Sequence, residues 1–579
     1  MKISKLFVIF FTIFNSINSS ALAIVAIDRQ ENSSVTADGS GAFIITGPDG
    51  DISFVDSIES VGIYGLGREI GIEVNTSSDK GIRIVGNSAI LIEAGLLDLH
   101  IKSGIVTSEY GQPFEGAVVL KNSLQGMNLV TLDAGTTLSN SAIADSNAIY
   151  YKNEGVGLQA GLTIINSGAI NIASQSTSNA IVLEDLFGNS SLVVTNNRGG
   201  VIGSELAPND GVAAIKVIGS NSANVTNFGT INGSLDLGGL ANINNAEGGT
   251  INGDILSSSI INNSGNINGN ILLGSGQSLN LNSLSIIRGD IEGSSAGRGS
   301  VNTGEGVEMV YGNIGSNNIL ANFNIFHGSQ AKIFGDIAAI NINLQGQLEL
   351  LNSSGSILFG NIVGDGLVDG VGNLDLSSYS HNLVGDLSLG DGDSISTSIF
   401  SRTVAGNLTV DGIASNDANS SLKVSLYGRN IRDVSSYKIL SALSGSSLNK
   451  ISDQNISVEG GSNRFGVFLF NTSVVDNSLM LNVERIYIPQ MAFNNNQLGL
   501  YNNLFNLSRV NLATGSLQNL QDYLDSSASN SSKSLAINSA LAQVDNSSNR
   551  LAFDNINNSA NLISRHLSSV RQNKDKKCD

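Results

Sequence analysis

The segments INGSL (231–235), INGDI (251–255) and INGNI (267–271) begin a series of nine related five-residue units, here called pentads. Each pentad has an apolar residue, a variable residue, glycine, usually Asp or Asn, and then Ile or Leu. The other six pentads begin at Ile287, Val310, Ile333, Leu358, Leu383 and Val404. Successive pentads start 20, 16, 20, 23, 23, 25, 25 and 21 residues apart. A period of this length predicts a stacked β-solenoid in which each pentad marks one turn.

Strand geometry predicts how a pentad is used. Alternate residues of an extended chain share a face, so Ile251, Gly253 and Ile255 are expected on one side and Asn252 and Asp254 on the other. The isoleucines then line an interior, and the polar pair faces water. Glycine suits a bend, or a place where neighbouring backbones approach closely.

Asn-rich segments surround the pentads. NNAEGG (244–249) and NNSG (262–265) supply turns before a strand, and Asn side chains at equivalent corners can stack in hydrogen-bonded ladders. Looser copies, INSGAINIA (165–173) and TNNRGGVIG (195–203), share the pattern of TNFGTING (226–233) and extend the coil toward the N-terminus. The fold is therefore expected to be all-β, with one elongated solenoid body.

Composition limits the classes of partner. The 579 residues include 30 Lys and Arg against 49 Asp and Glu, a formal net charge of −19. This acidity disfavours nucleic acid as the main ligand. Cys578 is the single cysteine, so no disulfide can form within the chain, and pairing with another chain stays open.

The N-terminus predicts export. Lys2 and Lys5 precede an apolar stretch at 6–14, and Ala21-Leu22-Ala23 follows as a cleavage site of small residues. This order is typical of a secretory signal peptide, expected at 1–23. The β-helix body is then expected at 24–414.

The pattern changes twice after residue 414. Longer strand-like runs such as SLKVSLYG (421–428) and SLMLNVERIY (478–487) predict a distinct cap of the coil at 415–487. From 488 to 571, apolar residues at helical spacing predict several short helices. These residues are Leu517, Leu520, Leu524, Ile537, Leu541, Val544, Ile563, Leu567 and Val570. A basic tail occupies 572–579.

The order of these segments resembles the passenger and pre-barrel region of bacterial autotransporters. YKILSA (437–442), NSLMLNVER (477–485), Asn496-Gln497 and RHLSSVR (565–571) carry the resemblance, which covers nearly the whole chain. It implies a right-handed parallel β-helix of the pectin-lyase-like type, a region at 415–487 that helps it fold, and a virulence-type surface protein of a Gram-negative bacterium. The expected location is the outer membrane, the cell surface or the medium.

In that family an outer-membrane translocator barrel follows the helical region, and it is the expected partner. The eight residues after Arg571 are too few for even a small barrel. A frameshift, an incomplete gene model or a separately encoded barrel are the open explanations. Without a barrel, the exported chain is expected to stay in the periplasm.

Few residues suggest reaction chemistry. The four histidines, His100, His327, His381 and His566, have no zinc-ligand spacing and are interpreted as solvent-exposed. GSSAG (293–297) matches G-x-S-x-G, but a nucleophile elbow needs a strand-to-helix turn, and a loop is expected here.

Acidic positions have two interpretations. GDGDS (390–394) and GDG (364–366) are similar to calcium-binding glycine repeats, but they lack the full nonapeptide and are interpreted as ordinary turns. Asp254, Asp290, Asp336 and Asp386 recur once per pentad and could form an acidic stripe. Asn takes the same place in alternate copies, which indicates a corner that accepts either side chain. No catalytic, cofactor-binding or metal-binding residue is predicted.

The leading functional hypothesis is a non-enzymatic secreted or surface-displayed passenger used in adhesion to host or neighbouring cells, because a long repeat offers extended surface. The alternative is a β-helix carbohydrate-active enzyme, a polysaccharide lyase or hydrolase, with paired acids on one face. A third hypothesis is a decaying locus without a functional product.

Overall fold

The computed structural model describes residues 23–485 and 495–538, with gaps. The gaps are 28, 32–34, 39–40, 48–50, 55–62, 67–68, 79, 86, 94, 110–114, 123–124, 142–145, 156–158, 174–178, 205–212, 220, 239, 257–259, 365–370, 402, 427–434, 444, 467, 510–519, 521–522, 525–532 and 534. Side-chain surroundings are described from Ile63 onward. Residues 1–22 of the expected signal peptide at 1–23, and the tail at 572–579, therefore lie outside the described residues, and Ala23 begins β1.

The chain forms two compact units. The first comprises Met1–Ser394, Leu408–Asp417 and Ala442–Ser447, and the second comprises Ile395–Asn407, Ala418–Ser441 and Leu448–Asp579. The boundaries that the sequence suggests at 414/415 and 487/488 stay predictions.

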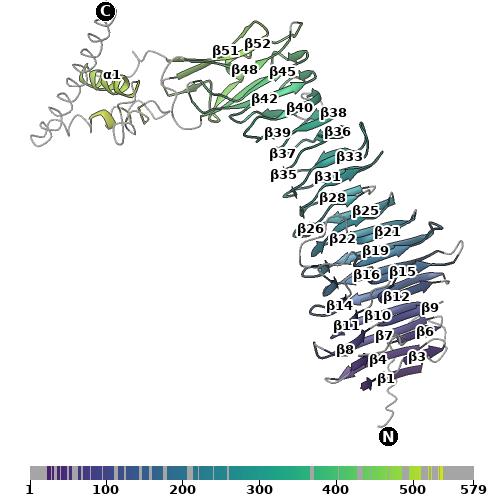
Figure 1. The fold of residues 1–579 in the computed structure, drawn as a ribbon. Helices are drawn as coiled ribbons and strands as arrows, with labels where there is room; N and C mark the ends of the chain where they lie inside the picture. Colours follow the sequence, from purple (N-terminus) through teal and green to yellow (C-terminus); the bar gives the residue numbers. More distant parts are fainter. Residues whose placement is uncertain are drawn as a thin grey trace, which may run out of the picture. The chain divides into compact units, whose positions relative to one another are not determined.

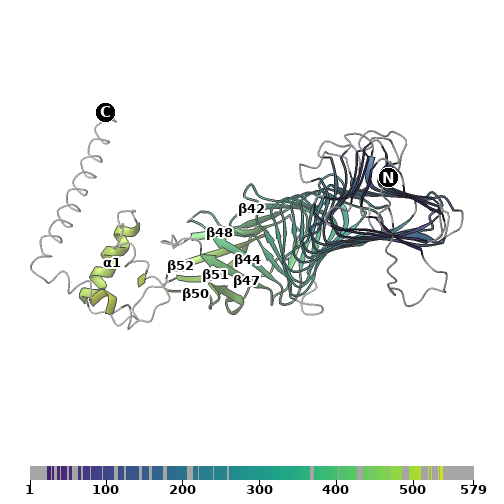
Figure 2. The same cartoon turned by 90° about the horizontal axis from the view of Figure 1, so that it is seen from below.

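Three parallel sheets build the first unit as a right-handed parallel β-helix, which confirms the predicted fold class (Figure 1). In each sheet a strand pairs with its counterpart one coil later, as β16, β19 and β22 do. Seen from below in Figure 2, the coils of this unit overlie one another around a shared interior. The isoleucines, leucines and valines that point inward fill that interior.

The first sheet consists of β1 (Ala23–Ile27), β4 (Gly41–Gly47), β7 (Glu69–Thr76), β10 (Leu96–Ser103), β13 (Gly126–Leu132), β16 (Ala160–Asn166), β19 (Ser190–Asn196), β22 (Ser222–Asn227), β25 (Leu240–Asn245), β28 (Ile260–Asn263), β31 (Ser278–Leu281), β34 (Ser300–Thr303), β36 (Leu320–Ile325), β38 (Ile337–Leu344) and β40 (Ile357–Val363), and then in this unit β42 (Ser380–Val384), β43 (Leu387–Leu389), β45 (Asn407–Val410) and β46 (Ala414–Asn416).

The second sheet consists of β2 (Arg29–Glu31), β5 (Asp51–Phe54), β8 (Gly81–Val85), β11 (Ile105–Glu109), β14 (Thr137–Asn140), β17 (Ala169–Ile172), β20 (Val201–Gly203), β23 (Thr230–Asn232), β26 (Thr250–Asn252), β29 (Asn266–Ile267), β32 (Ile286–Ile287), β35 (Gly306–Val310), β37 (Ser329–Ile333), β39 (Gln347–Leu350) and β41 (Asn373–Asp375).

The third sheet consists of β3 (Val35–Asp38), β6 (Ile63–Leu66), β9 (Ile90–Glu93), β12 (Glu115–Asn122), β15 (Ser146–Asn153), β18 (Ile181–Glu184), β21 (Ala213–Ile218), β24 (Ser234–Asp236), β27 (Ile255–Leu256), β30 (Ile271–Leu273) and β33 (Ile291–Gly293).

Each of the first pentads turns the corner between the second and third sheets. Ile251 of β26 and Ile255 of β27 are both fully buried, as predicted. Gly253 lies between the two strands, where an added Cβ would overlap the backbone of Gly233 in the preceding coil. The glycine is therefore needed because successive corners approach too closely for a side chain.

The glycine column shifts in the later pentads. From Gly233 to Gly335 each glycine stacks on the one before, but Gly360 lies against Ala339 instead, because the pairing of β38 with β40 changes register between Ala338 and Asn341. Gly385 stacks on Gly360, and Gly412 stacks on Gly385. The ninth pentad at 404–408 is thus outside the column, which continues through Gly412 instead.

A ladder of buried asparagines runs along the interior and confirms the expected stacking of corners. The Nδ2 atom of each side chain donates to the Oδ1 atom of the next at 2.8 Å, and all are fully buried. The members are Asn166, Asn196, Asn227, Asn245 and Asn263. Asn166 lies in the looser copy at 165–173, and Asn196 lies in the one at 195–203. Both copies therefore belong to the coil.

The second unit contains parallel strands, antiparallel strands and a helix, with β47 and β49 in parallel pairing. Its strands are β44 (Ser394–Ile399), β47 (Ser421–Leu426), β48 (Ser435–Ser441), β49 (Ile456–Val458), β50 (Arg464–Phe465), β51 (Phe468–Val475) and β52 (Ser478–Arg485), with a short 3-10 helix at Asp453–Asn455. β52 pairs antiparallel with β48 and β51. Leu479, Leu481 and Val483 of β52 are fully buried, as their alternation predicts.

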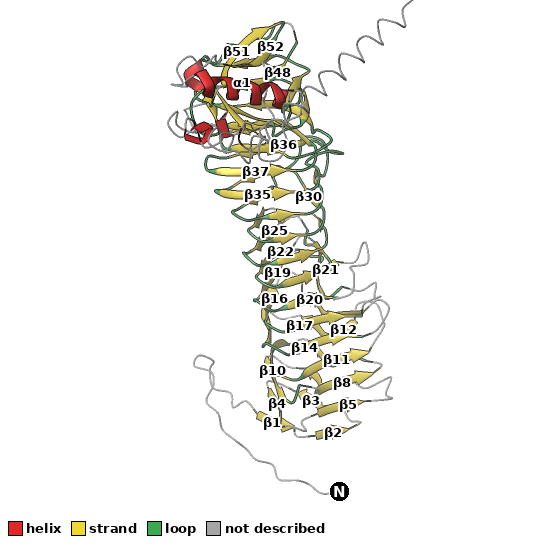
Figure 3. Ribbon diagram, turned by 90° about the vertical axis from the view of Figure 1, so that its left-hand side faces the viewer, coloured by secondary structure: helices red, strands yellow, loops and turns green. Residues whose placement is uncertain are grey.

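Helix α1 (Asn495–Arg509), coloured red in Figure 3, confirms that helix follows the strands. Tyr501 and Leu504 of α1 form a buried cluster with Leu524 and Ile537. Leu520, also expected from helical spacing, packs against this cluster. The other six residues that were expected on helices lie outside the described residues: Leu517, Leu541, Val544, Ile563, Leu567 and Val570.

Candidate functional site

In the first eight pentads the fourth residue, which includes the candidate acidic stripe, is part of a second ladder. Asp254 Oδ1 accepts a hydrogen bond from the backbone N–H of Asn270 at 2.7 Å. Asn270 Oδ1 accepts from the N–H of Asp290 at 2.8 Å, and Asp290 Oδ1 from that of Asn313 at 2.7 Å. Asn313 Oδ1 accepts from the N–H of Asp336 at 2.9 Å in the same way.

The ladder continues across the register shift with new partners. Asp336 Oδ1 accepts from the N–H of Ile357 at 2.9 Å, and Asp386 Oδ1 from the N–H of Ile413 at 2.8 Å. Each acid thus satisfies a backbone donor of the next coil. Because this needs only a carbonyl-type oxygen, Asp and Asn are equivalent here, as the alternation in the sequence indicates. Within the described residues, no group of three or more His, Cys, Asp or Glu side chains could hold a metal ion.

The second residues of the first six pentads form a surface column that changes chemistry along its length. Asn amides bond from coil to coil, and Arg288 donates to Asn268 at 3.1 Å. The Arg288 guanidinium lies 5.5 Å from the centre of the Tyr311 ring, and Tyr311 stacks on Phe334 with ring centres 4.5 Å apart. The faces of Tyr311 are therefore used within the column, which stabilises the coil and leaves little aromatic face for a ligand.

The histidines have separate surroundings. His100 Nε2 lies 3.2 Å from Asp133 Oδ1 in a half-exposed pair, and His327 is exposed. The expectation of exposure is wrong for His381, which is fully buried: Nδ1 accepts from the N–H of Ser356 at 2.9 Å, and Nε2 lies 3.1 Å from the carbonyl oxygen of Leu376. Burial lowers the pKa of His381, although the bond to Leu376 acts in the opposite direction. His566 lies outside the described residues.

The remaining motif candidates are structural elements. Ser295 lies in the turn between β33 and β34, so no helix follows it and no nucleophile elbow forms. Asp393 is fully buried, where its oxygens accept from the N–H groups of Gly372 at 2.8 Å and Gly390 at 2.7 Å. GDGDS is therefore an ordinary turn, as expected. Asp365 and Gly366 lie outside the described residues.

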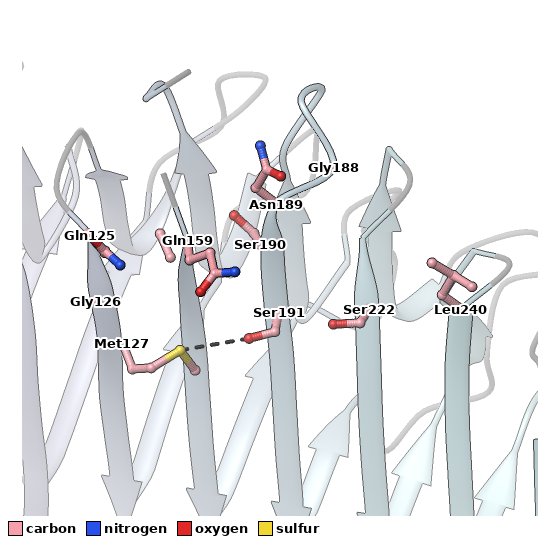
Figure 4. A pocket seen from close by; sticks show the side chains of 11 residues that line it. Gln125, Gly126, Met127, Gln159, Gly188, Asn189, Ser190, Ser191, Ser222 and Leu240 are labelled. Carbon is pink, nitrogen blue, oxygen red and sulfur yellow. Dashed lines mark hydrogen bonds between the residues drawn. The ribbon is translucent and has the colours of Figure 1, made fainter. Parts of the chain in front are cut away.

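A groove that the sequence did not indicate lies on the first sheet (Figure 4). It has a volume of about 520 Å³ and crosses the N-terminal ends of five successive strands, from β13 to β25. Its lining residues are Gln125, Gly126, Met127, Gln159, Ala160, Gly188, Asn189, Ser190, Ser191, Ser222 and Leu240. None of them carries a charge.

One row of residues in register forms the floor of the groove. Strand pairing places Met127, Gly161, Ser191, Ser222 and Leu240 side by side. Gly161 has no side chain, and the Met127 side chain occupies the space that a Cβ would fill. Met127 thereby reaches Ser191, whose Oγ lies 3.7 Å from the Met127 sulfur (Figure 4). The floor thus has two hydroxyl groups in its middle and an exposed apolar side chain at each end.

Three amide side chains, from Gln125, Gln159 and Asn189, stand beside this floor (Figure 4). All three residues are exposed, and none of the amides bonds to another residue within the described part of the chain. Each of these amides can both donate and accept hydrogen bonds.

A buried carboxylate fixes the loop at one side of the groove. Asp185 accepts from Ser190 Oγ at 2.6 Å, Asn153 Nδ2 at 3.0 Å, and the N–H groups of Phe187 at 2.7 Å and Asn189 at 3.2 Å. Burial alone would raise the pKa of Asp185, but these hydrogen bonds outweigh it and lower the pKa below its usual value. The loop is therefore held in one conformation by an ionised group that does not line the groove.

Comparison with known proteins adds no identification, since no family model and no curated protein matches the chain. Among the described helices, none has the length and apolar character needed to cross a membrane.

Proposed function

We propose that this chain is an exported, surface-displayed passenger of the autotransporter type that adheres to other cells without catalysing a reaction. The order of segments in the sequence supports export, with a translocator in the outer membrane as the partner. The β-helix supports adhesion, because a stack of coils presents a long surface to a partner.

The use of the pentad acids carries the non-enzymatic part of the proposal. A retaining or inverting glycosidase needs two carboxyl groups that converge on one bond. The pentad acids do not converge in this way, because one oxygen of each accepts a hydrogen bond from a backbone N–H of a neighbouring coil. These acids are Asp254, Asp290, Asp336 and Asp386. The groove of Figure 4 is lined by amides, hydroxyls and apolar groups, with no carboxylate among its lining residues.

A surface-accessibility experiment tests the export part. The full chain is expressed in a Gram-negative host together with a translocator, and intact cells are treated with protease or antibody. Labelling of intact cells is expected, and its loss when residues 6–14 are deleted is the control. Protection of the chain in intact cells, with release only on lysis, contradicts surface display.

A binding and turnover experiment tests the remaining part. Purified full chain is expected to bind epithelial or bacterial cells saturably and to leave polysaccharide and peptide substrates uncleaved. If the chain cleaves a substrate, and replacing one carboxylate or serine abolishes the cleavage, the protein is an enzyme. Cleavage of a polysaccharide would support the carbohydrate-active alternative.

A further inference from the structure

We propose that the groove between β13 and β25 binds a linear, uncharged oligosaccharide that runs along the β-helix axis. This inference rests on the adhesive function above and assigns its ligand class and site. Three properties of the groove support it: its neutrality, the order of its polar groups and its spacing.

The neutrality of the groove selects against charged ligands. The chain as a whole has a formal net charge of −19, yet each of the eleven residues that line the groove is uncharged. The carboxylate nearest in the chain, Asp185, is fully buried and bonded to Ser190 and Asn153. An anionic glycan would find no basic side chain here, and a cationic peptide would find no free carboxylate.

The order of polar groups fits the hydroxyl groups of a sugar. Each sugar hydroxyl donates and accepts, and side-chain amides and serine hydroxyls also do both. Gln125, Gln159 and Asn189 stand along one side, and Ser191 and Ser222 lie in the floor. The exposed side chains of Met127 and Leu240, 45% and 60% exposed, offer apolar contact to the C–H faces of sugar rings at the two ends.

The spacing of the groups favours a chain with a short repeat. The groove crosses five strands in parallel pairing, so equivalent side chains recur about every 4.8 Å along the axis. A linear chain of sugar units presents hydroxyl groups at a similar interval, so successive units can meet successive coils. The coil and the hydrogen-bonded loop at 185–190 are already ordered, so binding costs little conformational entropy of the protein backbone.

Two substitutions in the groove and one outside it form the test. Gln159→Ala removes an exposed amide, and Ser222→Ala removes a floor hydroxyl. Ser278→Ala is the matched control, because Ser278 begins β31 of the same sheet, outside the groove. Binding of the full chain is measured by titration with fluorescent cello-, malto- and galacto-oligosaccharides, and with sialylated and sulfated glycans and extended peptides for comparison.

The proposal predicts that one uncharged series binds with an affinity that changes little with salt, because no ion pair is involved. Each groove variant is expected to weaken binding about fivefold, since each loses one net hydrogen bond, and Ser278→Ala is expected to bind as the parent does. Preference for an anionic glycan or a peptide, absence of binding to any uncharged sugar, or equal affinity in all three variants would overturn it.

Cell adhesion separates this inference from the function on which it rests. If the parent chain adheres to cells and both groove variants adhere equally well, the groove assignment fails while the adhesive function stands. If the parent chain fails to adhere to any cell, the adhesive function itself fails. Circular dichroism of each variant confirms that the β-helix is intact.

Discussion

Asn196 donates from Nδ2 to Oδ1 of Asn227 at 2.8 Å, and both side chains are fully buried inside the β-helix. The same two atoms meet at each step from Asn166 to Asn263. A buried amide is costly unless its groups are paired, so the ladder specifies the alignment of each coil on the next. Coil alignment in turn sets the position of every surface side chain, including those of the groove.

Replacing Asn196 by Ala is therefore expected to destabilise the β-helix by about 2–3 kcal/mol, because Asn166 and Asn227 each lose a buried partner. Urea unfolding followed by circular dichroism measures the change. The control is Asn242→Ala, whose exposed amide bonds to Asn224 at 3.2 Å and which is expected to cost less than about 0.5 kcal/mol. Equal effects of the two substitutions would refute the role of the ladder.

Gly289 is expected to tolerate no side chain, because an added Cβ would overlap the carbonyl group of Gly269. Gly289→Ala should lower the free energy of unfolding by about 1–3 kcal/mol, the range for overpacked sites. Gly499 of α1 has no atom near the position of an added Cβ, and Gly499→Ala should be neutral or slightly stabilising. Thermal unfolding of the two variants compares them; a stable Gly289→Ala protein would show that the corners are not in close contact.

Glu308 is expected to make the fold less stable as the pH rises. It is 1% exposed and lies in β35, and neither carboxyl oxygen has a hydrogen-bond partner among the described residues. Burial raises the pKa of Glu308 from 4.5 to about 8, and it outweighs the opposite influence of the nearby backbone N–H groups of Glu308 and Gln330, which do not reach hydrogen-bond geometry with the carboxyl oxygens. The folded state thus binds a proton that the unfolded state releases, so stability is highest below pH 4.5 and is lost as the pH rises to about 8.

Glu308→Gln should remove that pH dependence, because the amide cannot ionise. The free energy of unfolding of the variant is expected to exceed that of the parent above pH 8 by on the order of 5 kcal/mol, and to approach it below pH 4.5. If the stability of the two proteins changes with pH in the same way across this range, Glu308 does not hold a proton in the interior of the folded state, and the prediction is wrong.

His381 has the opposite pH dependence. Burial lowers its pKa, so below the ordinary value of 6.5 the unfolded state takes up a proton that the folded state resists. Stability is therefore retained above pH 6.5 and falls as the solution becomes more acidic. His381→Asn should weaken this acid dependence, whereas replacement of the exposed His327 by Asn should leave it unchanged. An identical acid profile in all three proteins would contradict the assignment.

The sequence was sufficient for the coil because its signals are local and repeated. Strand alternation predicts that Ile251 and Ile255 face the interior, and the Asn-rich corners predict a ladder without identifying its members. The shift from Gly335 to Gly360 is not predictable from the spacing, since the pentad interval that contains it, 25 residues, is the same as the next interval. An irregularity inside β38 changes the register while the pattern of residues stays the same.

Residues brought together only by stacking were also missed. Ser191 and Ser222 are 31 residues apart and sit in ordinary strands, so no motif marks them as neighbours. The recurrence of Gln before a strand, at Gln125 and Gln159, was the one available signal. Burial of Glu308 and His381 could not be predicted either, because polar residues at single positions look alike whether they face water or the interior.

The most direct test of the account replaces Asp254, Asp290, Asp336 and Asp386 together by Asn. An Asn oxygen accepts the same backbone hydrogen bond as the carboxylate, so the fourfold variant should keep its unfolding temperature and should bind cells and uncharged oligosaccharides as the parent chain does. Loss of ligand binding, or loss of a glycan-cleaving activity found in the parent, would show that these acids act on a substrate and would contradict the account.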